Sequence, residues 1–533
     1  MGAEAIQQLA VLLVPFPAQG HVTPMLHLAR ALAAHGVAAT VAVPDFIHRR
    51  IAAAAATSRA RDNQAVGGVE LASIPSGIPH LPADESGGRH ADQPGFGAIV
   101  HAMENHMPEQ LERMLLSTGR GRVACLVVDV LASWAVPVAE RCGVPAAGFW
   151  PAMLASYRAV AAIPELLRKG VISESGTPAV SSNQLDDKDG REEQVVRGLR
   201  ILPAKLELST KELPWLVGDS ETQRSRFAFW LQTLRRARGF RSVLVNSFPS
   251  EAGAGSAAAE DDDGLQQPPP QRQAAGPRVL PVGPLLVLAG CNVERAKGAG
   301  GGGVAATNNN NSQPCSKNPA ASMWQADSTC IRWLDAQPAA SVVYVSFGSW
   351  VGPIGDDKIR ELALGLEATG RPFLWALKDD PSWRAGLPAG YAGSVAGRGK
   401  LVGWAPQDDV LGHAAIGCYL THCGWNSTVE AIQHGVRMLC CPVSGDQFIN
   451  CAYITRVWEI GLKLDSVSHD VVRDCIERIM GGTEGTRLQE KVDALRQRVV
   501  TGEARCLAQG NVRSFVNEIK RDHPLLTQIY NIL

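Results

Sequence analysis

The chain has 533 residues, which is long enough for two domains of ordinary size and the linkers around them. With 45% hydrophobic and 19% charged residues, it has the composition of a soluble globular protein. A formal net charge of −1, without long runs of Lys or Arg, argues against nucleic acid or an anionic membrane surface as the main partner.

The first part of the chain alternates predicted strands and helices. LAVLLVP (9–15) is a near-continuous apolar run, typical of a strand that is buried on both faces. The next segment, TPMLHLARALAAHG, has apolar residues at helical spacing, and we expect this helix to stop at Gly36. Further strand, helix and strand patterns follow in VAATVAV (37–43), RVACLVVD (122–129), SWAVPVAERCG (133–143) and VPAAGFW (144–150). This alternation predicts a parallel sheet covered by helices.

The pattern stops near residue 250. From 251 to 322 the chain is rich in Ala, Gly, Pro, Gln and Asn, with EDDD, QQPPPQ, GAGGGG and NNNNS. Such sequence buries too little apolar surface to offset its ordering entropy, so we predict a mostly disordered linker. Within it, only VLPVGPLL is apolar enough to dock on a domain. We interpret EDDD as a solvated charge run and not as a metal motif.

The alternation then resumes, which predicts a second domain of the same kind. Its expected elements are ASVVYVSFGS (340–349), KIRELALGLEATG (358–370), RPFLWAL (371–377), KLVGW (400–404), IGCYLTH (416–422) and RMLCCPV (437–443). We therefore predict an α/β protein with two doubly wound, Rossmann-like domains. In such sheets ligands bind at the carboxyl ends of the strands, so the cleft between the domains is the expected site.

A cytoplasmic location without a membrane span is the expected one. The 12 cysteines show no paired CxxC spacing, and we interpret them as thiols in a reducing compartment; Cys440 and Cys441 fit a strand as small apolar filler. The start MGAEAIQQLAVLLVP has no basic region of the kind that precedes a signal sequence. The apolar stretch 279–290 is short and broken by two prolines, so it cannot span a bilayer.

THCGWNSTVE (421–430) has the form of a strand end, a tight turn and a helix start. Gly424 allows close backbone approach, and Asn426 or Ser427 suits the helix N-cap. The free N–H groups of the first turn and the helix dipole would form an anion site, to which His422 can add a hydrogen-bond donor. A diphosphate is therefore the expected ligand. Two interpretations of Glu430 stay open. With Ser427 it forms a capping box that merely closes the helix, or its carboxylate grips a ribose diol.

Three more polar or aromatic residues follow predicted strands at the same edge of the sheet. Trp404 ends KLVGW, where it can be a core residue or stack on a flat base. Asp446 and Gln447 follow RMLCCPV. Asp446 can be a helix N-cap, or the pair can bind sugar hydroxyls through its donors and acceptors.

Over the 44 residues from Trp404 to Gln447, these positions together resemble the signature box of plant-type family 1 UDP-dependent glycosyltransferases. The matching elements are WAPQ, THCGWNS, Glu430 and the final DQ. Three further segments also resemble landmarks of this family, namely PFPAQGHVTP, VGPL and CIRWLDAQPAASVVYVSFGS. The low-complexity insert does not resemble the family. The resemblance implies a GT-B fold, in which two Rossmann-like domains face each other across a cleft.

The resemblance also implies a role for each matching residue. Trp404 would stack on uracil, the Ala405 backbone and Gln407 would fix the base and ribose, and Glu430 would bind the ribose hydroxyls. The diphosphate would be held by Ser349, His422, Asn426 and Ser427 around Gly424, and the sugar by Trp425, Asp446 and Gln447. Gln447 at the last position implies glucose as the donor sugar. Arg437, Cys441, Ser444 and Gly445 depart from the family pattern on the sugar and acceptor side, which leaves sugar preference and acceptor shape open.

The expected chemistry depends on His21 and Asp129. His21 lies in the turn after the first strand, ahead of Thr23 and Pro24, which have the form of an N-cap and a first-turn proline. A helix N-terminus and partial burial both disfavour the imidazolium, so His21 would stay a neutral base near pH 7. Asp129 ends its strand, where from the residues alone an N-cap role is equally possible. The resemblance implies that His21 is the catalytic base and that Asp129 orients it.

The implied reaction is a direct displacement that inverts the anomeric carbon, with the UDP-sugar as donor, a small hydroxylated lipophilic plant metabolite as acceptor and no metal ion. By the same resemblance, residues 1–250 would bind the acceptor and 323–505 the UDP-sugar, while 506–533 would pack back on the first domain of a monomer. We expect the acceptor pocket to be lined by three segments, WLQTLRR, FWPAMLASYRAV and HLPADESGGRHADQPGFG.

Two other functions share parts of this sequence pattern. A catalytically silent UDP-sugar-binding protein would keep the signature box but lose the base. A dinucleotide-dependent oxidoreductase would need G-x-G-x-x-G after its first strand, where this chain has PAQGH.

Overall fold

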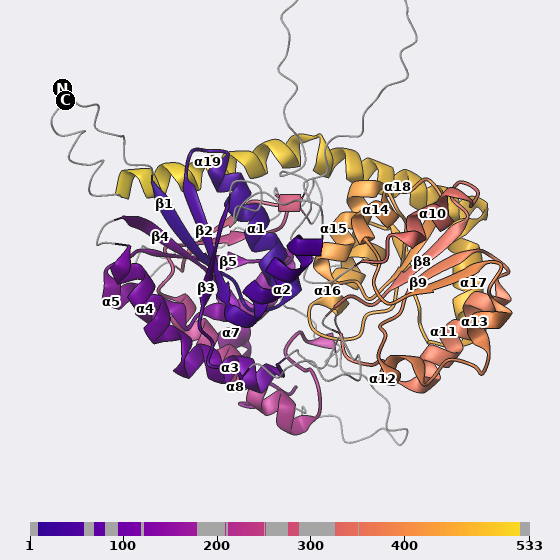
Figure 1. The fold of residues 1–533 in the computed structure, drawn as a ribbon, viewed down its shortest axis with the longest axis horizontal. Coiled ribbons are helices and arrows are strands. Elements are labelled where there is room, and N and C mark those ends of the chain that lie inside the picture. Colours follow the sequence, from indigo (N-terminus) through magenta and orange to yellow (C-terminus); the bar gives the residue numbers. More distant parts are fainter. Residues whose placement is uncertain are drawn as a thin grey trace, which may run out of the picture.

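The computed structural model describes residues 9–57, 69–79, 94–118, 122–178, 208, 212–249, 251, 276–286, 326–349 and 351–522. These residues form two all-parallel sheets with helices packed around them, which confirms the predicted pair of Rossmann-like domains (Figure 1). We call the part built on the seven-stranded sheet the first domain and the part built on the six-stranded sheet the second domain.

The sheet of the first domain has the strand order β3-β2-β1-β4-β5-β6-β7. Its strands are β1 (Ala10–Val14), β2 (Ala38–Pro44), β3 (Glu70–Ile74), β4 (Val123–Asp129), β5 (Ala146–Trp150), β6 (Ser242–Val245) and β7 (Arg278–Pro281). Its helices are α1 (Gln19–Ala33), α2 (Asp45–Thr57), α3 (Phe96–Asn105), α4 (Met107–Ser117), η1 (Val130–Ala132), α5 (Ala135–Cys142), α6 (Leu154–Ala161), α7 (Ile163–Arg168) and α8 (Ser220–Ala237). The four strands predicted in this half are β1, β2, β4 and β5, each within two residues of the expected bounds.

Helix α1 begins earlier than predicted, so the expected N-cap at Thr23 and first-turn role of Pro24 are wrong. Ala18 is the N-cap, with extended backbone at φ −136° and ψ 147°. Its carbonyl accepts hydrogen bonds from the backbone N–H groups of His21 and Val22, both at 2.9 Å. His21 therefore lies in the first helical turn and not in a preceding loop. Pro24 lies inside the helix.

The apolar island VLPVGPLL docks on the first domain. Its first three residues, 279–281, form β7 together with the preceding Arg278, and β7 pairs in parallel with β6 at the edge of the sheet. The rest of the predicted linker, 252–275 and 287–322, lies outside the described residues.

The sheet of the second domain has the order β10-β9-β8-β11-β12-β13. Its strands are β8 (Val342–Ser346), β9 (Phe373–Ala376), β10 (Gly399–Val402), β11 (Ile416–Thr421), β12 (Met438–Cys440) and β13 (Gly461–Lys463). Its helices are α10 (Thr329–Asp335), α11 (Asp356–Ala368), α12 (Pro381–Arg384), α13 (Tyr391–Ser394), α14 (Gln407–Leu411), α15 (Trp425–His434), α16 (Gln447–Ala452), η3 (Tyr453–Val457), α17 (His469–Met480) and α18 (Gly482–Val500). Strands β8 and β11 alternate their side chains between two apolar clusters, so this sheet is buried on both faces.

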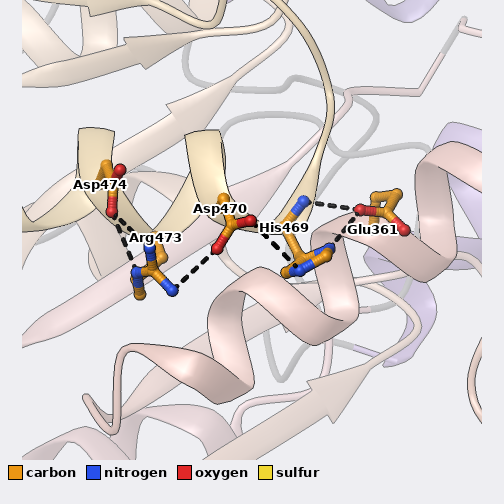
Figure 2. Close-up of polar contacts among 5 residues, drawn as sticks. All are labelled: Glu361, His469, Asp470, Arg473 and Asp474. Carbon is orange, nitrogen blue, oxygen red and sulfur yellow. Dashed lines mark hydrogen bonds and ion pairs between the residues drawn. The ribbon is translucent and has the colours of Figure 1, made fainter.

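A chain of polar contacts ties the start of α17 to α11 (Figure 2). The Glu361 carboxylate accepts from the backbone N–H of His469 and pairs with its ring Nδ1, both at 2.7 Å. These polar contacts continue along α17 through ion pairs of Asp470, Arg473 and Asp474. Glu361 thus satisfies a first-turn N–H of α17, whereas the exposed ion pairs beyond it contribute little stability.

The last described helix, α19 (Glu503–Asp522), runs along the first domain after α18 has covered the second (Figure 1). Val512, Phe515, Val516 and Ile519 of α19 belong to the apolar core of the first domain. The Asn511 side chain donates to the Pro281 carbonyl of β7 at 2.7 Å. None of the described helices is long and apolar enough to cross a membrane.

The domains also meet directly through the segment that follows β6. The indole N–H groups of Trp425 and Trp458, both from the second domain, donate to the carbonyls of Asn246 (2.6 Å) and Glu251 (2.8 Å). The Phe248 ring packs against both indoles, with centroids 6.4 Å and 5.7 Å away. This aromatic contact fixes one side of the cleft between the domains.

Glu251 anchors the same segment to the first domain. Its carboxylate accepts from the backbone N–H groups of Leu154 (3.1 Å) and Ala155 (2.6 Å) at the start of α6, and from the Ser247 hydroxyl. Burial raises the pKa of Glu251 to about 7, although these three donors oppose the shift.

Candidate active site

A cavity of about 970 Å³ lies between the two domains. Many of the residues that line it follow the carboxyl ends of strands from both sheets, as expected for doubly wound domains. It is lined by every predicted site residue except Asp129: His21, Ser349, Trp404, Ala405, Gln407, His422, Gly424, Trp425, Asn426, Ser427, Glu430, Asp446 and Gln447. The structure therefore brings the sequence-predicted residues together in one cleft.

The N-terminus of helix α15 lies at the wall of this cavity. Gly424 is its N-cap, with φ −61° and ψ 142°, so the expected N-cap at Asn426 or Ser427 is wrong. The chain turns sharply at Cys423, which has φ 65°, and this turn starts the helix at Trp425. The first-turn N–H groups of an α-helix have no intrahelical acceptor and carry the positive end of its dipole. They form an anion site at the cavity wall.

The predicted capping box of Ser427 and Glu430 does not form. Ser427 lies inside the helix, and α15 has no side-chain hydrogen bond at its N-cap. Instead the Gln407 side-chain amide donates to the Ser427 hydroxyl at 2.9 Å and to the Glu430 carboxylate. Glu430 thus faces the cavity and is available as an acceptor for a ligand.

His422 borders the anion site as a neutral ring. Its side chain is packed between two glycines: a Cβ added to Gly348 would lie 2.7 Å from the ring, and one added to Gly424 would lie 2.4 Å from Nε2. Burial lowers the pKa of His422 to about 4, so the imidazole is neutral near pH 7. His422 can therefore donate one hydrogen bond to an anion, but it adds no charge.

Lys378 adds the charge that His422 lacks, and the sequence analysis missed it. Its ammonium donates to the carbonyls of Ser349 (3.1 Å) and Val351 (2.6 Å) beside the anion site, and its side chain lines the cavity. Burial lowers its pKa to about 8. Because Lys378 follows the predicted strand 371–377, the carboxyl-end rule applied to Trp404 would have identified it.

A buried polar network organises the neighbouring part of the cavity. The hydroxyls of Tyr344 (3.2 Å) and Tyr419 (3.1 Å) both donate to the side-chain oxygen of Gln407, and their rings stack with centroids 5.0 Å apart. This fixes the Gln407 amide so that its nitrogen faces Ser427 and Glu430. Burial raises the pKa of Glu430 to about 7, against the opposing effect of the Gln407 donor.

Trp404 and Ala405 lie beside this network. Trp404 lines the cavity, and its carbonyl accepts from the backbone N–H of Asp327 at 2.8 Å. Its position at the carboxyl end of β10 leaves the indole at the cavity wall, where a planar base can stack.

At the far end of the second-domain wall, Gln447 and Asp446 are held by local hydrogen bonds. The side-chain oxygen of Gln447 accepts from the backbone N–H groups of Val443 (2.9 Å) and Ser444 (3.0 Å), which leaves its amide nitrogen as the donor. Asp446 precedes α16 but makes no capping hydrogen bond; it accepts from Asn450 at 3.0 Å. The Trp425 indole points to the domain interface, so a contact of Trp425 with a ligand would use its backbone N–H.

The first domain contributes the pair His21 and Asp129. Asp129 is fully buried, and its carboxylate lies 2.8 Å from Nδ1 of His21, whose side chain is 22% exposed. The other carboxylate oxygen accepts from the backbone N–H of Leu131 at 2.9 Å and caps η1. Asp129 therefore contacts His21 and caps η1, but it does not cap the helix expected over 133–143, because α5 has Trp134 as its N-cap. Because the carboxylate binds Nδ1, the Nε2 nitrogen of His21 is the one left for a ligand.

Among the residues that the structure describes, one group could hold a metal ion. The sulfur atoms of Cys423, Cys440 and Cys451 lie within 4.8 Å of one another and are buried. None of the three lines the cavity, so this group lies outside the site described above.

Comparisons with known proteins agree with this geometry. Residues 325–484 match the family model "UDP-glucoronosyl and UDP-glucosyl transferase", and residues 7–162 match "Glycosyltransferase, N-terminal domain". The chain is similar to UDP-glycosyltransferase 82A1 of Arabidopsis thaliana, with 41% identity over 96% of this chain and 99% of the relative.

Two further similarities cover most of the chain. DIMBOA UDP-glucosyltransferase BX8 of Zea mays is 32% identical over 91% of this chain and 93% of that protein. The crystal structure of a UDP-glucose: anthocyanidin 3-O-glucosyltransferase in complex with UDP is similar with a TM-score of 0.66 and 25% identity, over 96% of this chain and 99% of that one. This structural similarity confirms the GT-B arrangement of the two domains.

Proposed function

Because the chain belongs to the UDP-glucoronosyl and UDP-glucosyl transferase family, and within it to the plant UDP-glycosyltransferases, we propose that its cleft transfers glucose from UDP-glucose to a hydroxyl of a small lipophilic acceptor. Glycosyl transfer from a UDP-sugar is the activity of this family. The donor sugar, the acceptor class and the residue roles below are parts of the proposal.

His21 acts as the general base. Its Nε2 takes the proton from the acceptor hydroxyl, and the oxygen attacks the anomeric carbon from the face opposite UDP, which inverts the configuration. The Asp129 carboxylate, 2.8 Å from Nδ1, holds the ring in the required tautomer and stabilises the imidazolium that forms. General-base assistance of this kind is worth roughly 10²–10⁴-fold in rate. The single observation that carries the proposal is this pair, in which His21 lines the same cavity as the N-terminus of α15 and the buried Asp129 lies behind it.

The second domain binds the donor. Trp404 stacks on uracil beside the Ala405 backbone, while Gln407 and Glu430 hold the base and ribose. The first turn of α15, with Gly424, Asn426, Ser427, His422 and Ser349, binds the diphosphate and stabilises it as it leaves. The backbone of Trp425 and the side chains of Asp446 and Gln447 bind the sugar. The fixed amide of Gln447 presents donors to sugar hydroxyls, and glucose is supported by the resemblance of Gln447 to the last position of the family signature.

The acceptor side of the cavity is apolar and aromatic, which supports a lipophilic acceptor. Its wall in the first domain includes Phe16, Phe96, Trp150, Phe229 and Trp230. Relatives carry names with small cyclic acceptors, namely DIMBOA and anthocyanidin, and we propose a hydroxylated plant metabolite of similar size here. A silent UDP-sugar-binding protein is not favoured, because relatives are named glucosyltransferases and the base and its partner are paired.

We further propose that the transfer needs no metal ion and that the protein acts as a cytoplasmic monomer. In this scheme residues 1–250 bind the acceptor, 251–322 form a linker, 323–505 bind the donor and 506–533 return to the first domain. Lys378 and the dipole of α15 supply the positive potential that a metal ion provides in other transferases.

The test is UDP release by the purified protein with UDP-glucose, UDP-galactose or UDP-glucuronic acid and a panel of flavonols, simple phenols and terpenoid alcohols. We expect turnover with UDP-glucose and a β-glucoside product by NMR, since the donor is α-linked and the mechanism inverts. A retained α-configuration would contradict the mechanism. Binding of UDP-glucose without turnover of any acceptor would favour the silent binding protein.

A further inference from the structure

Helix α1 contains a carbonyl that its own sequence leaves without a helical partner. In an α-helix the carbonyl of residue i accepts from the N–H of residue i+4, and Pro24 has no N–H to give to Gly20. The proline ring also crowds that carbonyl and tilts it away from the helix axis. Gly20 is the residue next to His21, so the free acceptor lies on the turn that carries the proposed base.

This acceptor is used by the other domain. The side-chain nitrogen of Asn426, in the first turn of α15, donates to the Gly20 carbonyl at 3.2 Å across the cleft. Both residues line the cavity. A Cβ built on Gly20 would lie 3.9 Å from the Asn426 amide nitrogen, which is ordinary van der Waals contact, so the Asn426 side chain packs against Gly20 across the cleft. One hydrogen bond therefore joins the anion site of the second domain to the helical turn of His21.

We propose that Asn426 and Pro24 are positioning residues, which couple an occupied diphosphate site to the placement of His21 through the Gly20 carbonyl. The proposal rests on the proposed function, in which the donor diphosphate lies at the N-terminus of α15. A side-chain amide has two N–H donors. One binds a diphosphate oxygen, and the other holds Gly20, so the donor substrate and the base are fixed by the same group.

The chemistry of the two side chains explains why these residue types are needed. A Ser hydroxyl has one hydrogen to donate and cannot serve both acceptors, and a carboxylate has none and would repel the diphosphate. At position 24 any other residue would supply a backbone N–H to Gly20 and draw its carbonyl back toward the helix axis. Pro24 touches neither ligand in this scheme and acts only through the acceptor that it leaves open.

The test is a double-mutant cycle on kcat for glucosyl transfer, with Pro24→Ala, Asn426→Ala and the double variant. Pro24→Ala is expected to lower kcat roughly threefold to tenfold, the worth of one hydrogen bond, with little change in KM for UDP-glucose. In the Asn426→Ala background the same change is expected to have no further effect, because the donor to Gly20 is already gone. Pro164→Ala is the matched control, since Pro164 is an exposed first-turn proline of α7 outside the cavity.

If Pro24→Ala lowered kcat by damaging the fold, its melting temperature would fall as well. Replacing a proline inside a helix by alanine favours the helix, so the melting temperature of Pro24→Ala is expected to stay equal or rise while kcat falls. An unchanged kcat in Pro24→Ala, or the same loss in both backgrounds, would overturn the proposal. A fall in kcat together with a fall in melting temperature would also count against it.

A second readout separates this proposal from the proposed function. Hydrogen exchange of the first turn of α1 is expected to slow when UDP binds to the wild-type protein, and this slowing is expected to vanish in Asn426→Ala. If His21→Ala keeps wild-type kcat, the base assignment fails, and the exchange experiment still judges the coupling. Equal slowing in wild type and Asn426→Ala would refute the coupling even if His21 proves to be the base.

Discussion

The elevated pKa of Glu430 makes donor binding depend on pH near neutrality. In our proposal the carboxylate of Glu430 accepts hydrogen bonds from the ribose hydroxyls, and only the ionised form offers both oxygens as acceptors. Burial raises the pKa of this group in the free protein to about 7. Binding of the donor therefore has to displace a proton from part of the molecules, and the affinity for UDP-glucose rises between pH 6 and pH 8.

The size of the effect follows from the ionised fraction. For a group with a pKa of about 7, the competent fraction is roughly one tenth at pH 6 and roughly nine tenths at pH 8, so the apparent Kd should fall about tenfold over this range. That change corresponds to about 1.4 kcal/mol of binding free energy. The sign is opposite to that expected from a His or Lys whose charged form binds the diphosphate.

Isothermal calorimetry with UDP-glucose is the suitable assay, because this ligand itself does not titrate between pH 6 and pH 8. Titrations in two buffers of different ionisation enthalpy should also show net proton release on binding at pH 7. Glu430→Gln is the matched control, since it keeps one acceptor oxygen and cannot ionise. Its Kd is expected to be weaker at pH 8 and to change by about twofold at most between pH 6 and pH 8, because Lys378, with a pKa of about 8, loses part of its charge over this range. An apparent Kd of the wild type that does not change with pH, or an equal slope in Glu430→Gln, would refute the reasoning.

Three further substitutions test other parts of the site and its support. Asp129→Asn should lower kcat roughly 10- to 100-fold, the worth of a buried hydrogen bond to a charged ring, with the calorimetric Kd for UDP-glucose unchanged; a loss below about threefold would contradict the orienting role. Lys378→Met should weaken UDP-glucose binding about tenfold and reduce its dependence on salt, and an unchanged salt slope would argue against a charge contribution. Glu251→Ala should lower the free energy of unfolding by about 1–3 kcal/mol, because two N–H groups of α6 and the Ser247 hydroxyl lose their acceptor. Urea denaturation measures this change, and a fully stable variant would show that the anchor is dispensable.

The sequence was informative where burial dictates the residue pattern. Strands of a parallel sheet covered on both faces are near-continuous apolar runs, and such runs marked most of the strands in both domains. The carboxyl-end rule then placed Trp404, His422 and Asp446 at one edge, and the structure shows all three around one cavity. The same rule would have reached Lys378 if it had been applied to every strand.

Two predictions of helix starts from local sequence patterns were wrong. Thr23 and Pro24 have the form of a helix start, but the chain is already helical from Gln19, and the Gly20 carbonyl accepts from Asn426 of the other domain. Ser427 and Glu430 have the spacing of a capping box, but the turn at Cys423 moves the helix start to Trp425. The first outcome involves a contact between residues 406 positions apart, and the second depends on the turn at Cys423 and on Gln407, which lies 20 positions from Ser427 and 23 from Glu430.

The orientation of side chains at the domain interface was also beyond the sequence. Trp425 lies in the middle of the signature box, yet its indole packs on Phe248 and donates to Asn246. Nothing in the local pattern distinguishes a tryptophan that faces a ligand from one that faces a neighbouring domain.

In our proposal His21, oriented by Asp129, is the base that activates the acceptor in a cleft that binds UDP-glucose. The most direct test is the single-turnover rate of glucosyl transfer at saturating UDP-glucose and acceptor, compared between the wild type and His21→Ala. We expect this rate to fall roughly 10²–10⁴-fold, with the Kd for UDP-glucose preserved because the donor site lies on the other domain. A His21→Ala protein that transfers glucose within a few-fold of the wild-type rate would show that His21 is not the base.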